Sequence, residues 1–174
     1  MFNNIFNNED MIELQNYLKQ NNQTVTCAES CTGGLIASMI TEVSGSSSIF
    51  RGSIITYCNE IKEKELDVKK ETMIKYGVVS CEVVEEMLKG VLKKFNSTYA
   101  MAVSGVAGPT GGTKAKPVGT VVVGVMNEKG DKNISVYRFQ GSRQEVQIQA
   151  TKTALKKNFE ILFKNTWQIL LFLL

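Results

Sequence analysis

Short apolar runs alternate with amphipathic segments along the chain, and this alternation restricts the folds that it can adopt. The apolar runs are rich in β-branched side chains, as in buried strands, whereas the segments between them repeat their apolar residues at helical spacing. Strands that alternate with helices and end in one hairpin predict a three-layer α/β/α domain with a mixed sheet. The expected strands are 24–28, 52–57, 99–105, 120–127 and 133–140, and the expected helices are 9–21, 33–43, 59–66, 81–95 and 143–164.

The chain is the right size for one such domain. Its 174 residues suffice for one hydrophobic core, and with no internal repeat or linker we expect a single domain over 1–174. The run 99–105 is nearly all apolar, which predicts a central strand. The apolar tail 165–174 is too short for a membrane span, which needs about 20 residues. We expect it to continue the last helix into a core groove or a subunit interface, with an interfacial membrane contact as the alternative.

Composition and charge exclude several classes of protein. Apolar residues make up 43% and charged residues 21%, as in ordinary globular proteins and unlike disordered chains. The net charge is only +3, and Lys and Glu are interspersed, so we expect no nucleic-acid partner. No apolar run follows a basic start, and the four cysteines show no disulfide-framework spacing. A cytoplasmic protein without a signal peptide or transmembrane segment is expected.

The absence of histidine restricts the chemistry further. A chain with no histidine has no Ser-His-Asp triad, no Cys-His pair and no histidine-dependent zinc site. Proton transfer near neutral pH must then be carried by Lys, Tyr, Cys or a carboxylate with a shifted pKa.

The stretch CAESCTGG, residues 27–34, is the first candidate site. A zinc site there would lack ligands, because Cys27 and Cys31 have no second pair. A turn with Gly33 and Gly34 between a strand and a helix favours anion binding, since exposed N–H groups at the start of a helix attract anions. The stretch is not a P-loop, because no GK[ST] follows.

The same turn also presents a candidate nucleophile, Ser30, whose hydroxyl would face those amides. A plain helix start capped by Thr32 is the structural alternative. Tyr57 ends the second expected strand and Lys62 follows it on the next helix. Ends of parallel strands share one edge of a sheet, so Lys62 could face Ser30, although a solvated lysine is the simpler interpretation. Arg143 lies in the first turn of the last helix, where a cation is unfavourable unless an anion binds beside it.

Four blocks of the chain, in order, resemble the C-terminal domain of the competence-damage-inducible CinA family. They are AESCTGG, GSIITYCNEIK, SGVAGPTGGTKAKPVGTVVVGV and FQGSRQEV, and the resemblance covers about residues 10–160. The family includes nicotinamide-nucleotide amidohydrolases of the PncC type, which convert nicotinamide mononucleotide to nicotinate mononucleotide and ammonia. The resemblance implies this activity, a mixed, mostly parallel five-stranded sheet between helix layers, and a homodimer or larger homo-oligomer.

The resemblance also implies a serine–lysine site that acts on a small-molecule nucleotide without metal or cofactor. Ser30 would be the nucleophile, Lys62 its base and Arg143 a third polar site residue, with Tyr57 as a further catalytic candidate. A lysine acts as a base when burial or a nearby positive charge lowers its pKa. The expected substrate-binding residues are Thr32, Gly33, Gly34, Ser104, Gly105, Gly111, Gly112 and Arg143.

Two other functions stay open at this point. The chain could be a non-catalytic nucleotide-binding module, in which Gly111, Gly112 and Arg143 hold phosphate without chemistry, or a competence or recombination accessory that keeps the nucleotide pocket. Larger CinA proteins carry a molybdopterin-binding-like N-terminal domain with pyrophosphatase activity, and we do not expect that activity here.

Overall fold

The structure is a computed structural model that describes residues 1–172, with side chains up to residue 162. Its five strands form one sheet in the order β2-β1-β3-β4-β5. Strand β1 pairs in parallel with β2 and β3, whereas β4 is antiparallel to both β3 and β5, so β4 alone runs against the other four. The mixed, mostly parallel sheet with a central third strand is therefore confirmed. The strands are β1 Val25–Glu29, β2 Phe50–Ile55, β3 Tyr99–Gly105, β4 Thr120–Asn127 and β5 Lys132–Arg138.

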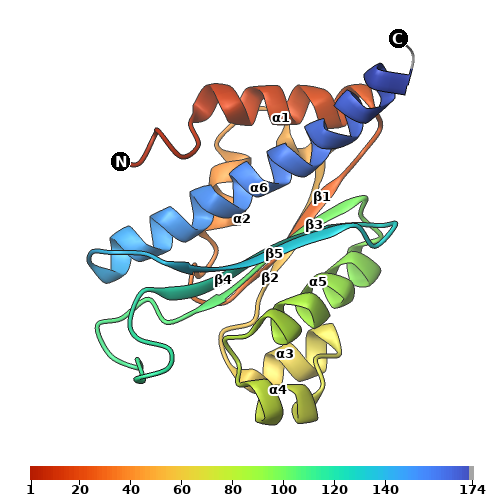
Figure 1. Ribbon diagram of the computed structural model, residues 1–174. Helices are drawn as coiled ribbons and strands as arrows, with labels where there is room; N and C mark the ends of the chain where they lie inside the picture. Colours follow the sequence, from red (N-terminus) through yellow and green to blue (C-terminus); the bar gives the residue numbers. More distant parts are fainter. Residues whose placement is uncertain (173–174) are drawn as a thin grey trace.

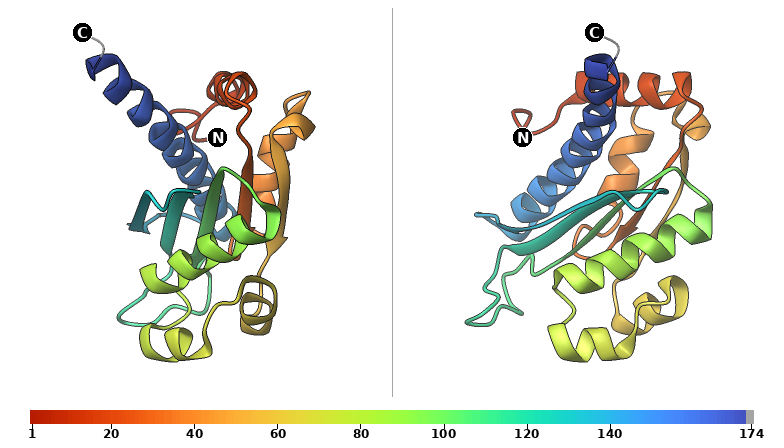
Figure 2. Two further views of the ribbon diagram at one scale, coloured as in Figure 1. Left: turned by 90° about the vertical axis from the view of Figure 1, so that its right-hand side faces the viewer. Right: turned by 45° about the vertical axis from the view of Figure 1, so that its right-hand side comes forward.

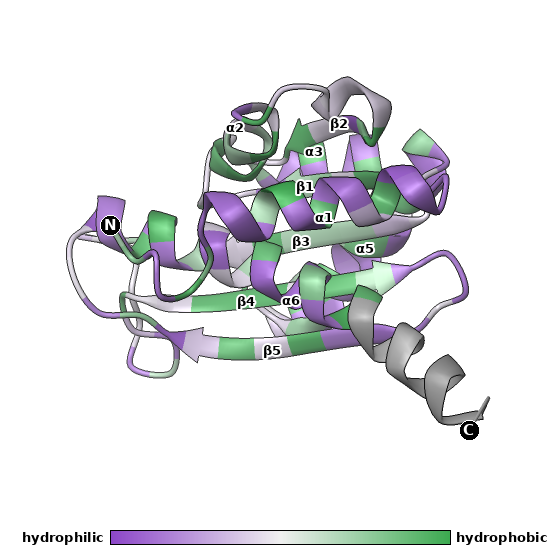
Figure 3. Cartoon of the chain, turned by 90° about the horizontal axis from the view of Figure 1, so that it is seen from above, coloured by the Kyte–Doolittle hydropathy of each residue, from purple (hydrophilic) through white to green (hydrophobic). Residues whose placement is uncertain are grey.

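Helices cover both faces of this sheet and complete the three predicted layers (Figures 1 and 2). Two separate clusters of buried apolar side chains, one on each face, hold the layers together. The first layer contains α1 Asn8–Gln20, α2 Leu35–Thr41 and α6 Arg143–Phe172, and the second contains α3 Asn59–Leu66, α4 Lys70–Tyr76 and α5 Cys81–Phe95. Seen from above, α1 lies over the strands, and hydrophilic and hydrophobic residues alternate along it (Figure 3). Its buried residues are Met11, Leu14, Gln15 and Leu18.

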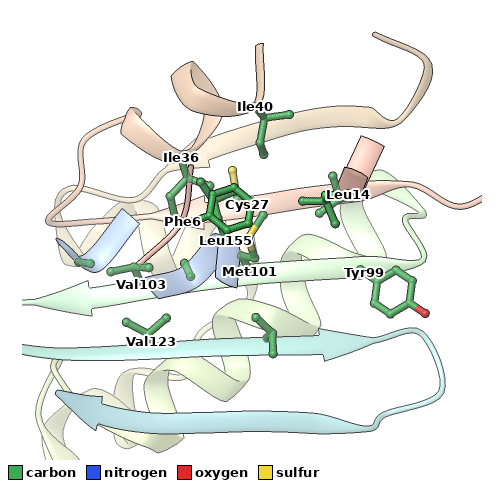
Figure 4. Close-up of a cluster of buried hydrophobic side chains, with 14 of the residues drawn as sticks. Phe6, Leu14, Cys27, Ile36, Ile40, Tyr99, Met101, Val103, Val123 and Leu155 are labelled. Carbon is green, nitrogen blue, oxygen red and sulfur yellow. The ribbon is translucent and has the colours of Figure 1, made fainter. Parts of the chain in front are cut away.

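Alternation along the strands decides which layer each side chain enters. On β1, Cys27 packs toward α1, α2 and α6, and its neighbour Ala28 packs toward α5. Ala28, Ala100 and Ala102 are small, so α5 can approach the sheet closely. Each large apolar side chain that α5 buries against them stabilises the folded state by about 1.5–3 kcal/mol. The first cluster is drawn in Figure 4, where the labelled residues are Phe6, Leu14, Cys27, Ile36, Ile40, Tyr99, Met101, Val103, Val123 and Leu155.

Two of the helix starts follow from local capping, as predicted. Ser80 precedes α5, and its Oγ accepts a hydrogen bond from the Val83 N–H at 3.3 Å. Before α6, the Ser142 N–H donates to the Glu145 carboxylate at 2.8 Å, and the Glu145 N–H donates to the Ser142 Oγ at 3.4 Å. These reciprocal bonds satisfy backbone donors that have no partner inside the helix.

The sequence gives no signal for α4, and the structure explains why. Met73 is its one buried residue, so no apolar period marks the helix. Its start is held from a distance instead, because the Glu86 carboxylate on α5 accepts from the Lys69 N–H at 2.8 Å and from the Thr72 hydroxyl at 2.8 Å. A helix that depends on such a tertiary contact cannot be found from local spacing.

The last helix continues into the apolar tail, as expected. The capped helix was predicted over about 143–164 with the tail extending it, and α6 runs from Arg143 to Phe172. The side chains of the tail lie outside the described residues, so its expected groove or interface contact stays a prediction. Among the described residues, no helix combines the length and the apolar character needed to cross a membrane.

Candidate active site

The central pair of the site is Ser30 and Lys62, which the fold brings together at the carboxyl ends of β1 and β2. Ser30 directly follows β1, and its N–H donates to the Val103 carbonyl of β3, which fixes the turn against the sheet. Lys62 lies one turn into α3, and its Nζ is 3.4 Å from the Ser30 Oγ. Both side chains are buried, with Lys62 only 2% exposed and Ser30 9%. The predicted contact between these two residues is present.

The burial of Lys62 shifts its protonation equilibrium toward the neutral amine. Burial lowers the pKa of the Lys62 ammonium below its ordinary value, because a charge is poorly solvated there. Its Nζ donates to the Thr56 carbonyl at 2.7 Å, and no carboxylate forms an ion pair with it among the described residues. A neutral amine beside a serine hydroxyl can accept its proton.

The start of α2 differs from the expected open anion site. The buried carboxylate of Glu29 accepts hydrogen bonds from the N–H groups of Gly34 at 2.9 Å, Ile36 at 3.1 Å and Ala37 at 3.0 Å. The Gly33 N–H is also engaged, with the Ser30 carbonyl at 3.2 Å. The expectation of free amides at the two glycines was therefore wrong, because the protein supplies its own anion there.

Thr32 does not cap α2 either. The residue at the cap is Gly34, in the left-handed conformation. The first N–H groups of the helix, which a Thr32 cap would have bound, donate to the Glu29 carboxylate instead. Thr32 is 1% exposed, and its Oγ1 has no hydrogen-bond partner among the described residues. Across that same part of the chain, the backbone N–H groups of Cys31 and Thr32 donate no hydrogen bond to another residue.

Tyr57 and Arg143 form a second pair at this edge of the sheet. The Arg143 guanidinium donates to the Tyr57 hydroxyl at 2.7 Å and to the Gly108 carbonyl at 2.7 Å. Tyr57 is 62% exposed, so the pair lies at the surface beside the buried Ser30–Lys62 pair. Arg143 thus ties the last helix, the end of β2 and the glycine-rich loop 106–119 together.

The other predicted binding residues have structural contacts of their own. The Ser104 hydroxyl donates to the Val78 carbonyl at 2.7 Å. A side chain at Gly105 would approach the Thr120 carbonyl to 2.9 Å, so this glycine allows β3 and β4 to pair closely. Gly111 and Gly112 lie in the 106–119 loop, and in the described part of the chain nothing links them to the Ser30–Lys62 pair. Their binding roles stay predictions.

The cysteines of the opening motif are buried and do not resemble metal ligands or nucleophiles. Burial, with the Glu29 charge beside it, keeps the pKa of the Cys27 thiol well above its usual range. Burial also raises the pKa of the Cys31 thiol to about 12, although Arg143 and Lys62 act in the opposite direction. No group of three or more His, Cys, Asp or Glu side chains that could hold a metal ion occurs in the described residues.

Three residues of the site were missed from the sequence: Glu29, Thr56 and Gln147. Thr56 holds Lys62 through its carbonyl, and the Gln147 side chain on α6 donates to the Cys31 carbonyl at 2.7 Å. Glu29 could have been found, because a charged residue that ends a buried strand requires internal partners. Gln147 could not, since its partner lies 116 residues away.

Comparison with known proteins identifies relatives of this chain. The family model described as the CinA C-terminal domain matches residues 8–162. The nicotinamide-nucleotide amidohydrolase PncC of Escherichia coli K12 is 43% identical over 149 residues, which are 86% of this chain and 90% of that protein. A CinA-like protein of Endomicrobium trichonymphae is 49% identical over 138 residues, which are 79% of this chain and 32% of that protein. The chain thus spans about a third of the length of such CinA-like relatives.

Solved structures of the same superfamily share the fold. The competence/damage inducible protein CihA of Agrobacterium tumefaciens superposes with a TM-score of 0.84 at 35% identity, over 86% of this chain and 91% of that one. A CinA superfamily protein of Klebsiella pneumoniae gives a TM-score of 0.85 at 31% identity, over 90% of this chain and 97% of that one. With the family model covering most of its length, the chain belongs to the CinA C-terminal domain family.

Proposed function

We propose that this protein is an amidohydrolase that converts nicotinamide mononucleotide to nicotinate mononucleotide and ammonia. The observation that carries the proposal is the buried Lys62 Nζ beside the Ser30 Oγ, in a chain that has no histidine to serve as base. The PncC amidohydrolases, 43% identical over most of both chains, support the choice of substrate.

The proposed reaction is an acyl transfer. Neutral Lys62 takes the hydroxyl proton as the Ser30 Oγ forms a bond to the carboxamide carbon. The N–H groups of Thr32 and Cys31 are our candidates for stabilising the oxyanion, since among the described residues neither donates to another residue and the neighbouring amides are already occupied. The Cys31 N–H contacts its own thiol. Lys62 then gives its proton to the nitrogen, the C–N bond breaks and ammonia leaves. In the second half, Lys62 takes a proton from water as the water oxygen bonds to the ester carbon, and it returns that proton to the Ser30 Oγ as the C–O bond breaks. The nicotinate product then releases its acid proton to solvent.

Ammonia release from nicotinamide mononucleotide by the purified protein tests this function. We expect catalytic turnover, with nicotinate mononucleotide formed in equal amount to ammonia. A stoichiometric binder that releases no ammonia would instead be the non-catalytic nucleotide-binding or accessory module. Free nicotinamide serves as the control substrate, because it carries the same amide without ribose or phosphate.

Replacing Arg143 by alanine is expected to impair the nucleotide more than the nucleoside. We assign the unengaged N–H groups of this guanidinium to the substrate phosphate, because a cation in the first turn of a helix is favoured when an anion binds beside it. The specificity constant for nicotinamide mononucleotide should fall about 10- to 100-fold, the value of a charge-assisted hydrogen bond. The constant for nicotinamide riboside should fall far less.

Equal losses for both substrates would contradict the phosphate assignment. Arg143 would then act through Tyr57, whose hydroxyl it holds. Tyr57→Phe, measured with both substrates, is the matched control, since it removes that contact and leaves the arginine charge in place.

A further inference from the structure

The carboxylate of Glu29, the residue before the proposed nucleophile, accepts hydrogen bonds from five groups, and the proposed mechanism gives it no chemical step. It is 0% exposed, and besides three amides of α2 it contacts the Ser53 hydroxyl at 3.4 Å and the Cys27 thiol at 3.6 Å. All of these groups donate to it. A carboxylate with so many donors is held rigidly and has no lone pair turned toward a substrate.

The bonds of Glu29 connect the end of β1 to the start of α2 across the turn that contains Ser30. The backbone carbonyl of Glu29 accepts from the Thr56 N–H at 2.6 Å and from its hydroxyl at 3.2 Å, while the Thr56 carbonyl holds Lys62. One residue therefore fixes the turn of the nucleophile through its side chain and the support of the base through its backbone. Burying a charge for the fold alone would be costly compared with an apolar residue.

We propose that Glu29 is a positioning residue that acts through Ser30, an inference that rests on the proposed function. Its carboxylate occupies the start of α2 as a built-in anion, which sets the 30–34 turn and directs the Ser30 Oγ toward Lys62. It also removes the Gly34, Ile36 and Ala37 amides from the set available to the oxyanion. A displacement of the nucleophile by about 1 Å costs on the order of a hundredfold in rate.

The test compares Glu29→Gln with Glu85→Gln, the same change in a glutamate that pairs with Lys89 and Lys132 at the opposite edge of the sheet. Gln keeps the size of the side chain but turns an N–H₂ group toward backbone N–H donors. We expect kcat for nicotinamide mononucleotide to fall about 10- to 100-fold, with KM within about threefold and an unchanged midpoint of the pH profile. The control should retain the kcat of the natural protein.

Covalent labelling of Ser30 by a fluorophosphonate, followed by mass spectrometry, separates this inference from the proposed function. Labelling requires a correctly placed serine but no amide substrate, so it should slow in Glu29→Gln in proportion to kcat. A natural protein that is labelled but releases no ammonia would contradict the proposed amidase and leave the role of Glu29 measurable. Formate, added to Glu29→Ala, should restore part of the labelling rate by filling the vacated anion position.

Three results would overturn the proposal. The first is a folded Glu29→Gln protein whose kcat and labelling rate stay within twofold of those of the natural protein. The second is a loss that appears only in KM. The third is a shifted midpoint of the pH profile, which would mean that Glu29 acts on the pKa of Lys62 and not on the position of Ser30. If Gln prevents folding, Glu29→Asp keeps the charge and withdraws the carboxylate by one methylene. It should then show the same parallel loss of kcat and labelling, and its full activity would equally overturn the proposal.

Discussion

Replacing Ser30 by alanine is expected to abolish deamidation of nicotinamide mononucleotide while the protein stays folded. Without the Oγ no ester can form, and loss of a nucleophile costs several orders of magnitude in turnover. The fold should persist, because Lys62 keeps its shorter bond to the Thr56 carbonyl and the Ser30 N–H keeps its bond to Val103. Ammonia release and the melting temperature of the variant measure the two expectations separately.

A matched serine change makes the Ser30 result specific. Ser48 lies in the 3₁₀ turn before β2, at the opposite end of the strand from the site, and its hydroxyl bonds only to the nearby Gly45 carbonyl among the described residues. Ser48→Ala should therefore keep full turnover. If Ser30→Ala retained more than about a tenth of the natural turnover, the hydroxyl could not be the nucleophile.

Topology allowed a contact between Ser30 and Lys62, and the resemblance to the CinA family selected that contact over a solvated lysine. Parallel strands place their carboxyl ends at one edge, and Lys62 follows β2 closely enough to reach back to the residue after β1. Local patterns located the strands that carry the two residues, and Ser80 and Ser142 marked two helix starts. They did not by themselves show that Lys62 is buried against Ser30.

The parts that could not be predicted depend on contacts between distant residues. The amides at the start of α2 looked available because the sequence shows a glycine turn but not the direction of the Glu29 side chain. In the same way, α4 depends on Glu86, and the Cys31 carbonyl depends on Gln147. Hydrophobic periodicity and sequence motifs report on residues that are close along the chain. These three interactions join segments that come together only in the folded protein, so periodicity and motifs do not predict them.

The pH dependence of the reaction should reveal Lys62 as the base. Burial lowers the pKa of Lys62, so the neutral, reactive amine becomes populated at a lower pH than for a solvated lysine. The specificity constant should rise with pH as Lys62 loses its proton and level off above that pKa, with an apparent midpoint below the ordinary lysine value of about 10.4. The Ser30→Ala protein, carried through the same pH series, reports any background hydrolysis.

Lys62→Arg is the sharpest test of that assignment. Arginine keeps the positive charge and can still donate to the Thr56 carbonyl, but its guanidinium does not deprotonate in proteins, so it cannot accept the Ser30 proton. We expect a loss of at least about a thousandfold in kcat, within the range for a lost catalytic group, and a residual rate that no longer rises through the lysine midpoint. An Arg variant with substantial turnover and an unchanged pH profile would exclude Lys62 as the base. Tyr57 would then be the next candidate, because its hydroxyl is held at the same edge of the sheet by Arg143.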